Sequence, residues 1–372
     1  AYSVPEAFEF RFDHRTRLVV MVIVMVVYGI MFAMQPRAAA AVLAPMINVD
    51  ITIMSWVMAC IFIIQALVGL RGIAGMNIVH ASVLYAGVGI VAFLAFREVG
   101  GLAPISQALP EHFLRVDYPN VQSMIGTAVG SMFGFILSST LVANVYGAKS
   151  KKAANTGVSV AAVLVIIFAL FPAFVGVAGR YLMPDAAPGT ILYSVAGRYG
   201  DVVGGIASMA IIAAVFSTGP AFLLTLSTTL TRDFYVALIK PDADDKAQLR
   251  FSKLAIVGIG LVATFLGLNA TSILSQVSGA FQIRSVAGVV LIISVYWKKV
   301  DKRAAFWSIL VGGIVAAVWH FSGQPFGIVP FWPGNIVGVA ILLVLTLTNG
   351  YSESPDYTAY REHMEAIPPE EL

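Results

Sequence analysis

The chain has 372 residues, of which 59% are apolar and only 12% are charged, and its mean hydropathy is +0.86. No water-soluble fold has enough interior to bury that much apolar surface, which excludes a soluble enzyme, a disulfide-stapled secreted domain and a disordered chain. The net charge of +3 is too small to indicate nucleic-acid binding, and the single cysteine, Cys60, rules out an internal disulfide. The composition therefore predicts an integral membrane protein.

Ten stretches are long and apolar enough to cross a bilayer, which takes about 20 residues of helix. They are expected at residues 18–34, 51–70, 78–96, 125–146, 158–181, 202–230, 254–268, 273–297, 304–321 and 328–347. Runs such as 18–27 and 336–345 lack the alternation of apolar and polar residues that strands of a membrane β-barrel show. We therefore expect an all-α, multi-span helical bundle, with a membrane domain over residues 1–350 and a short cytoplasmic tail over residues 351–372.

Lys and Arg are distributed unevenly between the loops on the two sides of these spans. The side that holds the first residues carries 17 of them, and the opposite side carries only four. Because Lys and Arg accumulate in cytoplasmic loops, we expect both ends of the chain in the cytoplasm. On the opposite side, the loop from about residue 97 to residue 122 is expected to carry a short surface helix at residues 102–114. A large interior loop is expected after Leu230.

Hydroxyl groups are concentrated in the sixth span. One helix face carries, at spacings of three and four residues, Ala214, Ser217, Thr218 and Ala221. Two hydroxyls and a backbone carbonyl can supply hard oxygen ligands for a cation such as sodium. Small and hydroxylated residues also line the interfaces between packed membrane helices, so the residues alone leave both interpretations open.

Arg284 lies about midway along the eighth span, where a charged side chain costs about 2.5–3.5 kcal/mol on insertion scales. No acidic residue in the spans is an obvious partner for it. A guanidinium can form two parallel hydrogen bonds to a carboxylate in a bidentate pair, which favours the binding of an anionic group of a solute. A structural pairing, and a fixed positive charge that replaces a bound cation, are the alternatives.

Five stretches resemble, in the same order along the chain, motifs of the sodium:solute symporter family. They are 4–12 (VPEAFEFRF), 69–75 (GLRGIAG), 148–154 (AKSKKAA), 214–235 (AVFSTGPAFLLTLSTTLTRDFY) and 296–305 (YWKKVDKRAA). The family includes sodium-coupled carriers of proline, pantothenate, sugars and sialic acid. The resemblance covers nearly the whole chain and implies a LeuT-type inverted-repeat transporter fold. In the family the first of these stretches follows the second core helix, so the N-terminal helices are expected to be missing from this sequence.

The resemblance also implies roles for single residues. The matching sodium ligands are the backbone carbonyl of Ala214 and the hydroxyls of Ser217 and Thr218. Gly219 and Pro220 follow where the family carries an acidic residue, so the ligands from this helix are neutral.

The solute cavity of the family is lined at positions that correspond here to Gln35, Ser138 and Ser139, and Arg284 joins them by the argument given above. Hydroxyls in apolar helices also serve as packing groups, which is the alternative for both serines.

The function that follows is a sodium-coupled symporter that imports a small organic solute, such as a carboxylate or an amino acid, across a bacterial inner membrane. Its partners would be the solute, the sodium ion and the lipid bilayer. A symporter-like sensor module and a non-transporting homologue are the alternatives. The sequence contains no nucleotide-binding loop, paired-cysteine metal site, catalytic triad or haem motif. It is therefore expected not to be an enzyme and to need no cofactor, with sodium as the coupling ion.

Overall fold

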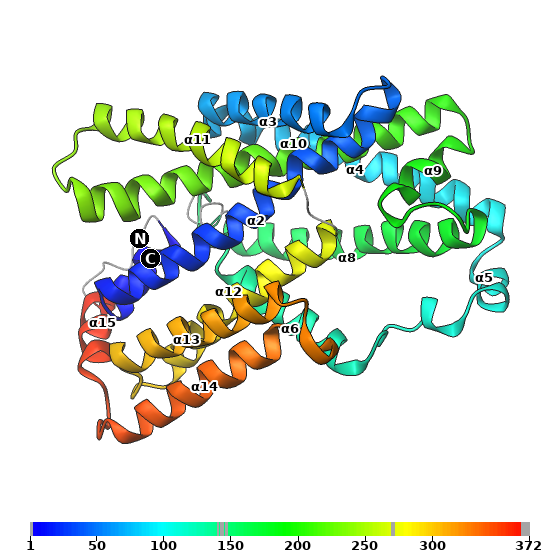
Figure 1. The fold of residues 1–372 in the computed structure, drawn as a ribbon. Helices are drawn as coiled ribbons and strands as arrows, with labels where there is room; N and C mark the ends of the chain where they lie inside the picture. The colour runs from blue at the N-terminus through cyan, green and yellow to red at the C-terminus, as the bar shows by residue number, and fades with distance from the viewer. Residues whose placement is uncertain (1–2, 140, 142–144, 146–147, 269–271, 366–372) are drawn as a thin grey trace.

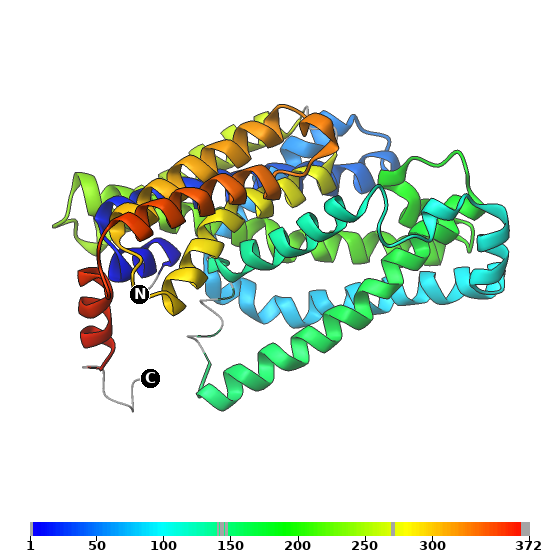
Figure 2. The same ribbon diagram turned by 90° about the horizontal axis from the view of Figure 1, so that it is seen from below.

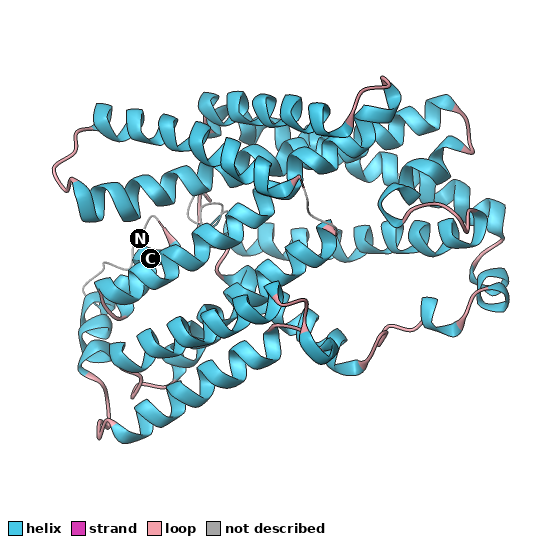
Figure 3. Ribbon diagram, in the orientation of Figure 1, coloured by secondary structure: helices cyan, strands magenta, loops and turns pink. Residues whose placement is uncertain are grey.

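The computed structural model describes residues 3–139, 141, 145, 148–268 and 272–365, and for residues 70–76, 364 and 365 it describes the backbone alone. Within these ranges the chain is a bundle of long helices joined by short loops, and it contains no strand (Figure 1, Figure 3). The expected all-α membrane bundle is therefore confirmed.

Nine helical segments in the described ranges are long and apolar enough to cross a membrane, and they match nine of the predicted spans. They are α2 (His14–Met46), α3 (Ile51–Val68), α4 (Leu70–Val99), α8 (Lys151–Leu182), α10 (Asp201–Thr229) together with η3 (Leu230–Ile239), α11 (Asp245–Gly267), α12 (Ile273–Tyr296), α13 (Lys302–Phe321) and α14 (Phe331–Thr348).

The fourth predicted span is interrupted. Its first part is α6 (Val121–Ile136), an apolar helix of 16 residues. The helix stops at Leu137 and Ser138, and helical backbone resumes at Ser139. Several positions of the second part, including 140 and 142–144, lie outside the described residues. A discontinuous helix of this kind exposes backbone groups inside the bundle, and such helices often form binding sites in transporters.

Side-chain caps explain where several helices begin. Asp13 accepts a hydrogen bond from the Thr16 N–H at the start of α2, and Asp301 accepts one from the Ala304 N–H at the start of α13, each at 2.9 Å. These carboxylates satisfy N–H groups that have no partner within the helix. The C-terminal end of α4 is set by Gly100, whose φ of 78° is a conformation that glycine adopts without strain.

Two predicted boundaries are wrong because packing extends the helices. The first span, expected to end at residue 34, continues through Pro36 to Met46, and Ala39 and Ala40 of this extension are fully buried. The large interior loop expected after Leu230 is instead η3, a π-helix that leads almost directly into α11. Local hydropathy predicts neither extension, because contacts with other helices stabilise both.

The loop that follows α4 contains α5 (Leu102–Ala108) and η1 (Glu111–Phe113), where one short surface helix was expected. The connection between α8 and α10 also contains two short helices, η2 (Pro188–Thr190) and α9 (Ile191–Gly197).

Helix α2 lies at the centre of the bundle and packs against α3, α10, α11, α12 and α13 (Figure 1). The two short helices α1 (Val4–Arg11) and α15 (Pro355–Glu365) pack together at one end of the bundle, with the rings of Phe10 and His363 stacked at 5.5 Å. Helix α8 runs along the edge (Figure 2), and little of it is buried by the rest of the described chain. The central position of α2 places it against α10, which carries Ala214, Ser217 and Thr218, and against α12, which carries Arg284.

Candidate sodium and solute site

The three predicted sodium ligands meet within a single turn of α10. The hydroxyls of Ser217 and Thr218 both donate to the backbone carbonyl of Ala214, at 2.7 and 2.9 Å. All three residues are half-buried. Three oxygen atoms are therefore brought together on the helix face that the sequence predicted.

Gln35 of α2 faces this turn. Its side-chain Oε1 lies 3.2 Å from the Thr218 hydroxyl. The approach of the two helices depends on Gly219, where an added Cβ would lie 3.4 Å from Cβ of Gln35 and 3.2 Å from the ring of Phe62 on α3. The structure thus groups Gln35, predicted as a solute residue, with the predicted sodium ligands.

The resulting set of oxygens is neutral and hard: two hydroxyls, one peptide carbonyl and one side-chain amide. Oxygens of this type suit a sodium ion, and none of them needs to lose a proton to bind it. The same hydrogen bonds also satisfy the hydroxyls internally, as Ser and Thr often do by bonding to the carbonyl three or four residues earlier. The geometry is therefore compatible with both interpretations of the sixth span.

Arg284 of α12 is buried, with only 1% of its surface exposed. Its guanidinium carbon lies 5.3 Å from the ring centre of Tyr28 and 5.1 Å from that of Phe281. Its Nε and Nη1 have no hydrogen-bond partner in the part of the chain that the structure describes. No carboxylate of the described residues lies within ion-pair distance of it. Arg284 therefore holds a charge and at least two donors that the described protein does not satisfy.

Tyr28 connects this guanidinium to the break that follows α6. The Tyr28 hydroxyl accepts a hydrogen bond from the Ser139 N–H at 3.0 Å, and it also interacts with the side chains of Ser138 and Arg284. Three of the four predicted solute residues are thereby brought to one place. The sequence analysis missed Tyr28, although a phenol within an apolar run, two helical turns before Gln35, was a usable signal.

The site thus consists of two clusters. The oxygen cluster is Ala214, Ser217, Thr218 and Gln35, and the arginine cluster is Arg284, Tyr28, Ser138 and Ser139. The two clusters share α2 and lie close together. Tyr28 and Gln35 are seven residues apart, which corresponds to about 10 Å along a helix. The ring of Tyr28 also makes an edge contact with Phe222 of α10, at 5.6 Å and 61°. Phe222 is one turn beyond Thr218, so the same two helices carry both the oxygen cluster and the contact to Arg284.

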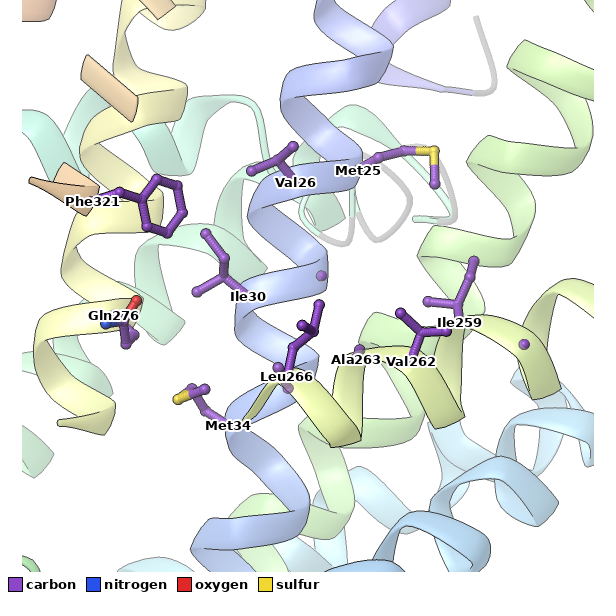
Figure 4. A pocket seen from close by; sticks show the side chains of 13 residues that line it. Met25, Val26, Ile30, Met34, Ile259, Val262, Ala263, Leu266, Gln276 and Phe321 are labelled. Atoms are coloured by element: carbon purple, nitrogen blue, oxygen red, sulfur yellow. The ribbon is translucent and has the colours of Figure 1, made fainter. Parts of the chain in front are cut away.

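An apolar groove lies elsewhere on the described residues. It has a volume of about 710 Å³ and runs between α2, α11 and α12 (Figure 4). Almost all of its lining is apolar, and Val26, Val262 and Leu266 are exposed at its rim. None of the predicted site residues lines it. Such a surface suits contact with lipid tails, and it is not the site assembled around α2 and α10.

Comparison with known proteins agrees with the fold and the order of motifs. The model of the family described as "Sodium:solute symporter family" matches residues 1–312. The osmoregulated proline transporter OpuE of Bacillus subtilis is 22% identical over 97% of this chain and 76% of its own length. The monocarboxylic acid transporter of Corynebacterium glutamicum is 28% identical over 70% of this chain and 55% of its own length.

A solved structure has the same fold. It is the substrate-bound outward-open state of a Na⁺-coupled sialic acid symporter, which superimposes with a TM-score of 0.77 over 95% of this chain and 78% of that chain, at 19% identity. The LeuT-type architecture implied by the motifs is therefore confirmed. A family model that matches more than four fifths of the chain and a shared transporter fold lead to one conclusion: this chain belongs to the sodium:solute symporter family.

Proposed function

We propose that this protein couples the inward movement of sodium to the uptake of a small solute that carries a carboxylate group. The observation that carries the proposal is Arg284, a guanidinium with 1% exposure near the break after α6, two of whose donors bond to none of the described residues. In this proposal the protein lies in a bacterial inner membrane, and α1 and α15 lie on its cytoplasmic side.

A carboxylate is the solute group that fits this environment. An isolated charge in a medium of low polarity is strongly destabilised unless it is paired. A carboxylate neutralises the guanidinium and can accept two parallel hydrogen bonds from it, which a neutral sugar cannot do. The proline and monocarboxylic acid transporters among the relatives act, by their names, on solutes that carry this group, and this supports the proposal.

Sodium is proposed to bind at the oxygen cluster of α10. The Ala214 carbonyl, the hydroxyls of Ser217 and Thr218 and the Gln35 amide oxygen would supply its ligands. Inward movement of one positive charge releases about 2.3 kcal/mol per 100 mV of inward-negative potential, which can drive accumulation of the solute. Coupling requires that sodium and the solute favour the same conformation, so that each raises the affinity for the other.

The solute assignment is tested by uptake into proteoliposomes with a panel of carboxylates and neutral sugars as competitors. Arg284→Lys keeps the positive charge but cannot form the bidentate pair with a carboxylate, so we expect weaker carboxylate uptake. Arg284→Ala should reduce the uptake further. Arg37→Lys is the matched control, because Arg37 donates to the Leu268 carbonyl outside the cluster. Preference for sugars, or wild-type carboxylate uptake by Arg284→Ala, would overturn the assignment.

The sodium assignment is tested with a control from the same helix. Ser217→Ala combined with Thr218→Ala should raise the sodium concentration needed for half-maximal uptake. Thr228 donates to the Leu224 carbonyl at 2.9 Å, the same local bond as in the cluster, but it lies more than two turns further along α10. Thr228→Ala should therefore leave the sodium dependence unchanged. If the double variant behaves like Thr228→Ala, the hydroxyls are packing groups.

A further inference from the structure

We propose that Tyr28 is a positioning residue that couples the sodium-bearing helix α10 to Arg284. The inference rests on the proposed function, because it assigns to Tyr28 the link between the two clusters that bind sodium and the carboxylate. Tyr28 touches neither ligand in this proposal and acts through Arg284.

The ring of Tyr28 contacts both sides of the site. Tyr28 is 1% exposed. Its ring centre lies 5.6 Å from that of Phe222 on α10 and 5.3 Å from the guanidinium carbon of Arg284. An aromatic edge contact and a cation over a ring both depend on the orientation of the ring. A displacement of α10 at Phe222 therefore changes the position of the surface against which the guanidinium rests.

The hydroxyl of Tyr28 fixes the same ring at its other end. It accepts the Ser139 N–H at 3.0 Å and interacts with the side chains of Ser138 and Arg284. The bond to the Ser139 amide anchors the hydroxyl to the backbone of the break that follows α6. Tyr28 cannot move without changing its contact with the α6 break, with Arg284, or with both.

Sodium binding provides the displacement. Thr218 lies one turn before Phe222. A sodium ion that takes the Thr218 hydroxyl and the Ala214 carbonyl as ligands replaces the hydrogen bond between them, and so it acts on the part of α10 that touches Tyr28. The geometry then predicts that sodium raises carboxylate affinity through the Phe222–Tyr28–Arg284 contacts. Coupling between two sites is commonly 5- to 150-fold in affinity, and it acts equally in both directions.

The experiment measures the KM for a carboxylate solute at low and at saturating sodium, in proteoliposomes of the full chain. Tyr28→Phe keeps the ring and removes the hydroxyl. We expect it to raise the KM at saturating sodium and to reduce the ratio of the two KM values about tenfold, with a smaller change in kcat. Phe222→Leu removes the edge contact and keeps the hydroxyl, so it should reduce the ratio and leave the KM at saturating sodium nearer to that of the wild type.

Tyr85→Phe is the matched control, because the ring of Tyr85 packs on Phe168 of α8, at 4.7 Å, away from both clusters. It should leave both KM values unchanged. In an Arg284→Lys background, Tyr28→Phe should add little to the KM, since a positioning residue has no effect without the group that it positions.

The outcomes separate this proposal from the one on which it rests. If Arg284→Ala transports carboxylates like the wild type, the proposed function fails. If Arg284→Ala is impaired but Tyr28→Phe retains the wild-type KM ratio, the role of Tyr28 is overturned and the proposed function stands. If Tyr28→Phe does not accumulate as a folded protein, the test uses Phe222→Leu instead. An unchanged KM ratio in Phe222→Leu would also overturn the role of Tyr28.

Discussion

Arg17, where α1 meets the bundle, and Arg284, midway along α12, lie in very different surroundings. Arg17 is partly buried, with 11% of its side chain exposed, whereas Arg284 is 1% exposed. Arg17 donates from Nε and Nη2 to Oδ1 of Asp233 at 3.0 and 2.6 Å, and its Nη1 bonds to Glu9. Oδ1 of Asp233 also accepts the Ser3 hydroxyl at 3.2 Å. Arg284 has no carboxylate within reach among the described residues, and two of its donors are unpaired. The more deeply buried of the two arginines is therefore the one that has no carboxylate partner among the described residues.

Arg11 lies between these two cases. Its Nη2 donates to the backbone carbonyls of Ser294 and Val300, at 2.9 and 3.3 Å, and its guanidinium packs near the rings of Phe12 and Tyr357. Its Nε and Nη1 have no partner among the described residues. Arg17 and Arg11 bond to carboxylates or to backbone carbonyls of distant residues and so tie helices together, whereas for Arg284 we propose a ligand as the partner. Four variants test this comparison.

The largest effect is expected from Asp233→Ala, which removes the fully buried member of the pair and leaves the partly buried Arg17 with Glu9 as its bonded carboxylate. Removal of one member of a buried ion pair typically lowers the free energy of unfolding by about 3–5 kcal/mol. Thermal and denaturant unfolding of the purified protein in detergent measure the change. Replacement of both residues, Arg17→Met with Asp233→Leu, should recover most of the loss. If Asp233→Ala and the double variant are equally stable, the loss in Asp233→Ala does not come from an Arg17 charge that has lost its neutralising carboxylate.

An effect of the opposite sign is expected for Arg284→Met. The substitution removes a buried charge and leaves no charged partner behind, so the free energy of unfolding should rise by about 1–3 kcal/mol. Carboxylate uptake should fall in the same preparation. The two measurements together distinguish a functional arginine from a structural one. A loss of stability comparable to that of Asp233→Ala would place Arg284 in the structural class.

A smaller loss is expected for Arg11→Lys. An ammonium cannot reproduce both hydrogen bonds to Ser294 and Val300 or the packing of the planar guanidinium, and we expect a decrease of about 1–2 kcal/mol in the free energy of unfolding. Arg15→Lys is the control, because Arg15 is exposed. The same melting experiment measures both variants, and indistinguishable melting temperatures would show that the Arg11 contacts contribute nothing.

The smallest effect concerns Glu9 and acid. Burial raises the pKa of Glu9, but hydrogen bonds and charge interactions with His14 and Arg17 lower it by more, so the pKa lies below its ordinary value of 4.5. A carboxyl group with a depressed folded-state pKa stabilises the fold above its unfolded pKa, and this contribution is lost as the pH falls through the folded value. Because the side chain is partly exposed, the contribution should be within about 0–1 kcal/mol.

The check is the melting temperature of the wild type and of Glu9→Gln between pH 7 and about pH 3.5. The wild type should be the more stable protein at neutral pH, and the difference should shrink below pH 4.5. A difference that stays constant with pH would exclude ionisation of Glu9 as its cause.

The membrane class, nine of the ten predicted spans with their order, and the family all follow from the sequence alone. Hydropathy is a local property, so runs such as 304–321 coincide with a helix, α13, to within a few residues. The grouping of Ala214, Ser217 and Thr218 was also predictable, since the periodicity of a single helix brings them together.

Contacts between distant residues were decided only by the tertiary structure. Tyr28 meets Ser139 across 111 positions, Gln35 meets Thr218 across 183, and Arg17 meets Asp233 across 216. The sequence marked most of these residues as polar or charged in an apolar setting, but it could not say which of them are paired. The interruption after α6 and the continuation of α10 as η3 have the same origin, because packing against other helices outweighs local propensity where a helix breaks or extends. Pairing decides whether a charge inside the bundle is satisfied, and so only the fold distinguishes Arg17, neutralised by Asp233, from Arg284, which has no carboxylate partner among the described residues.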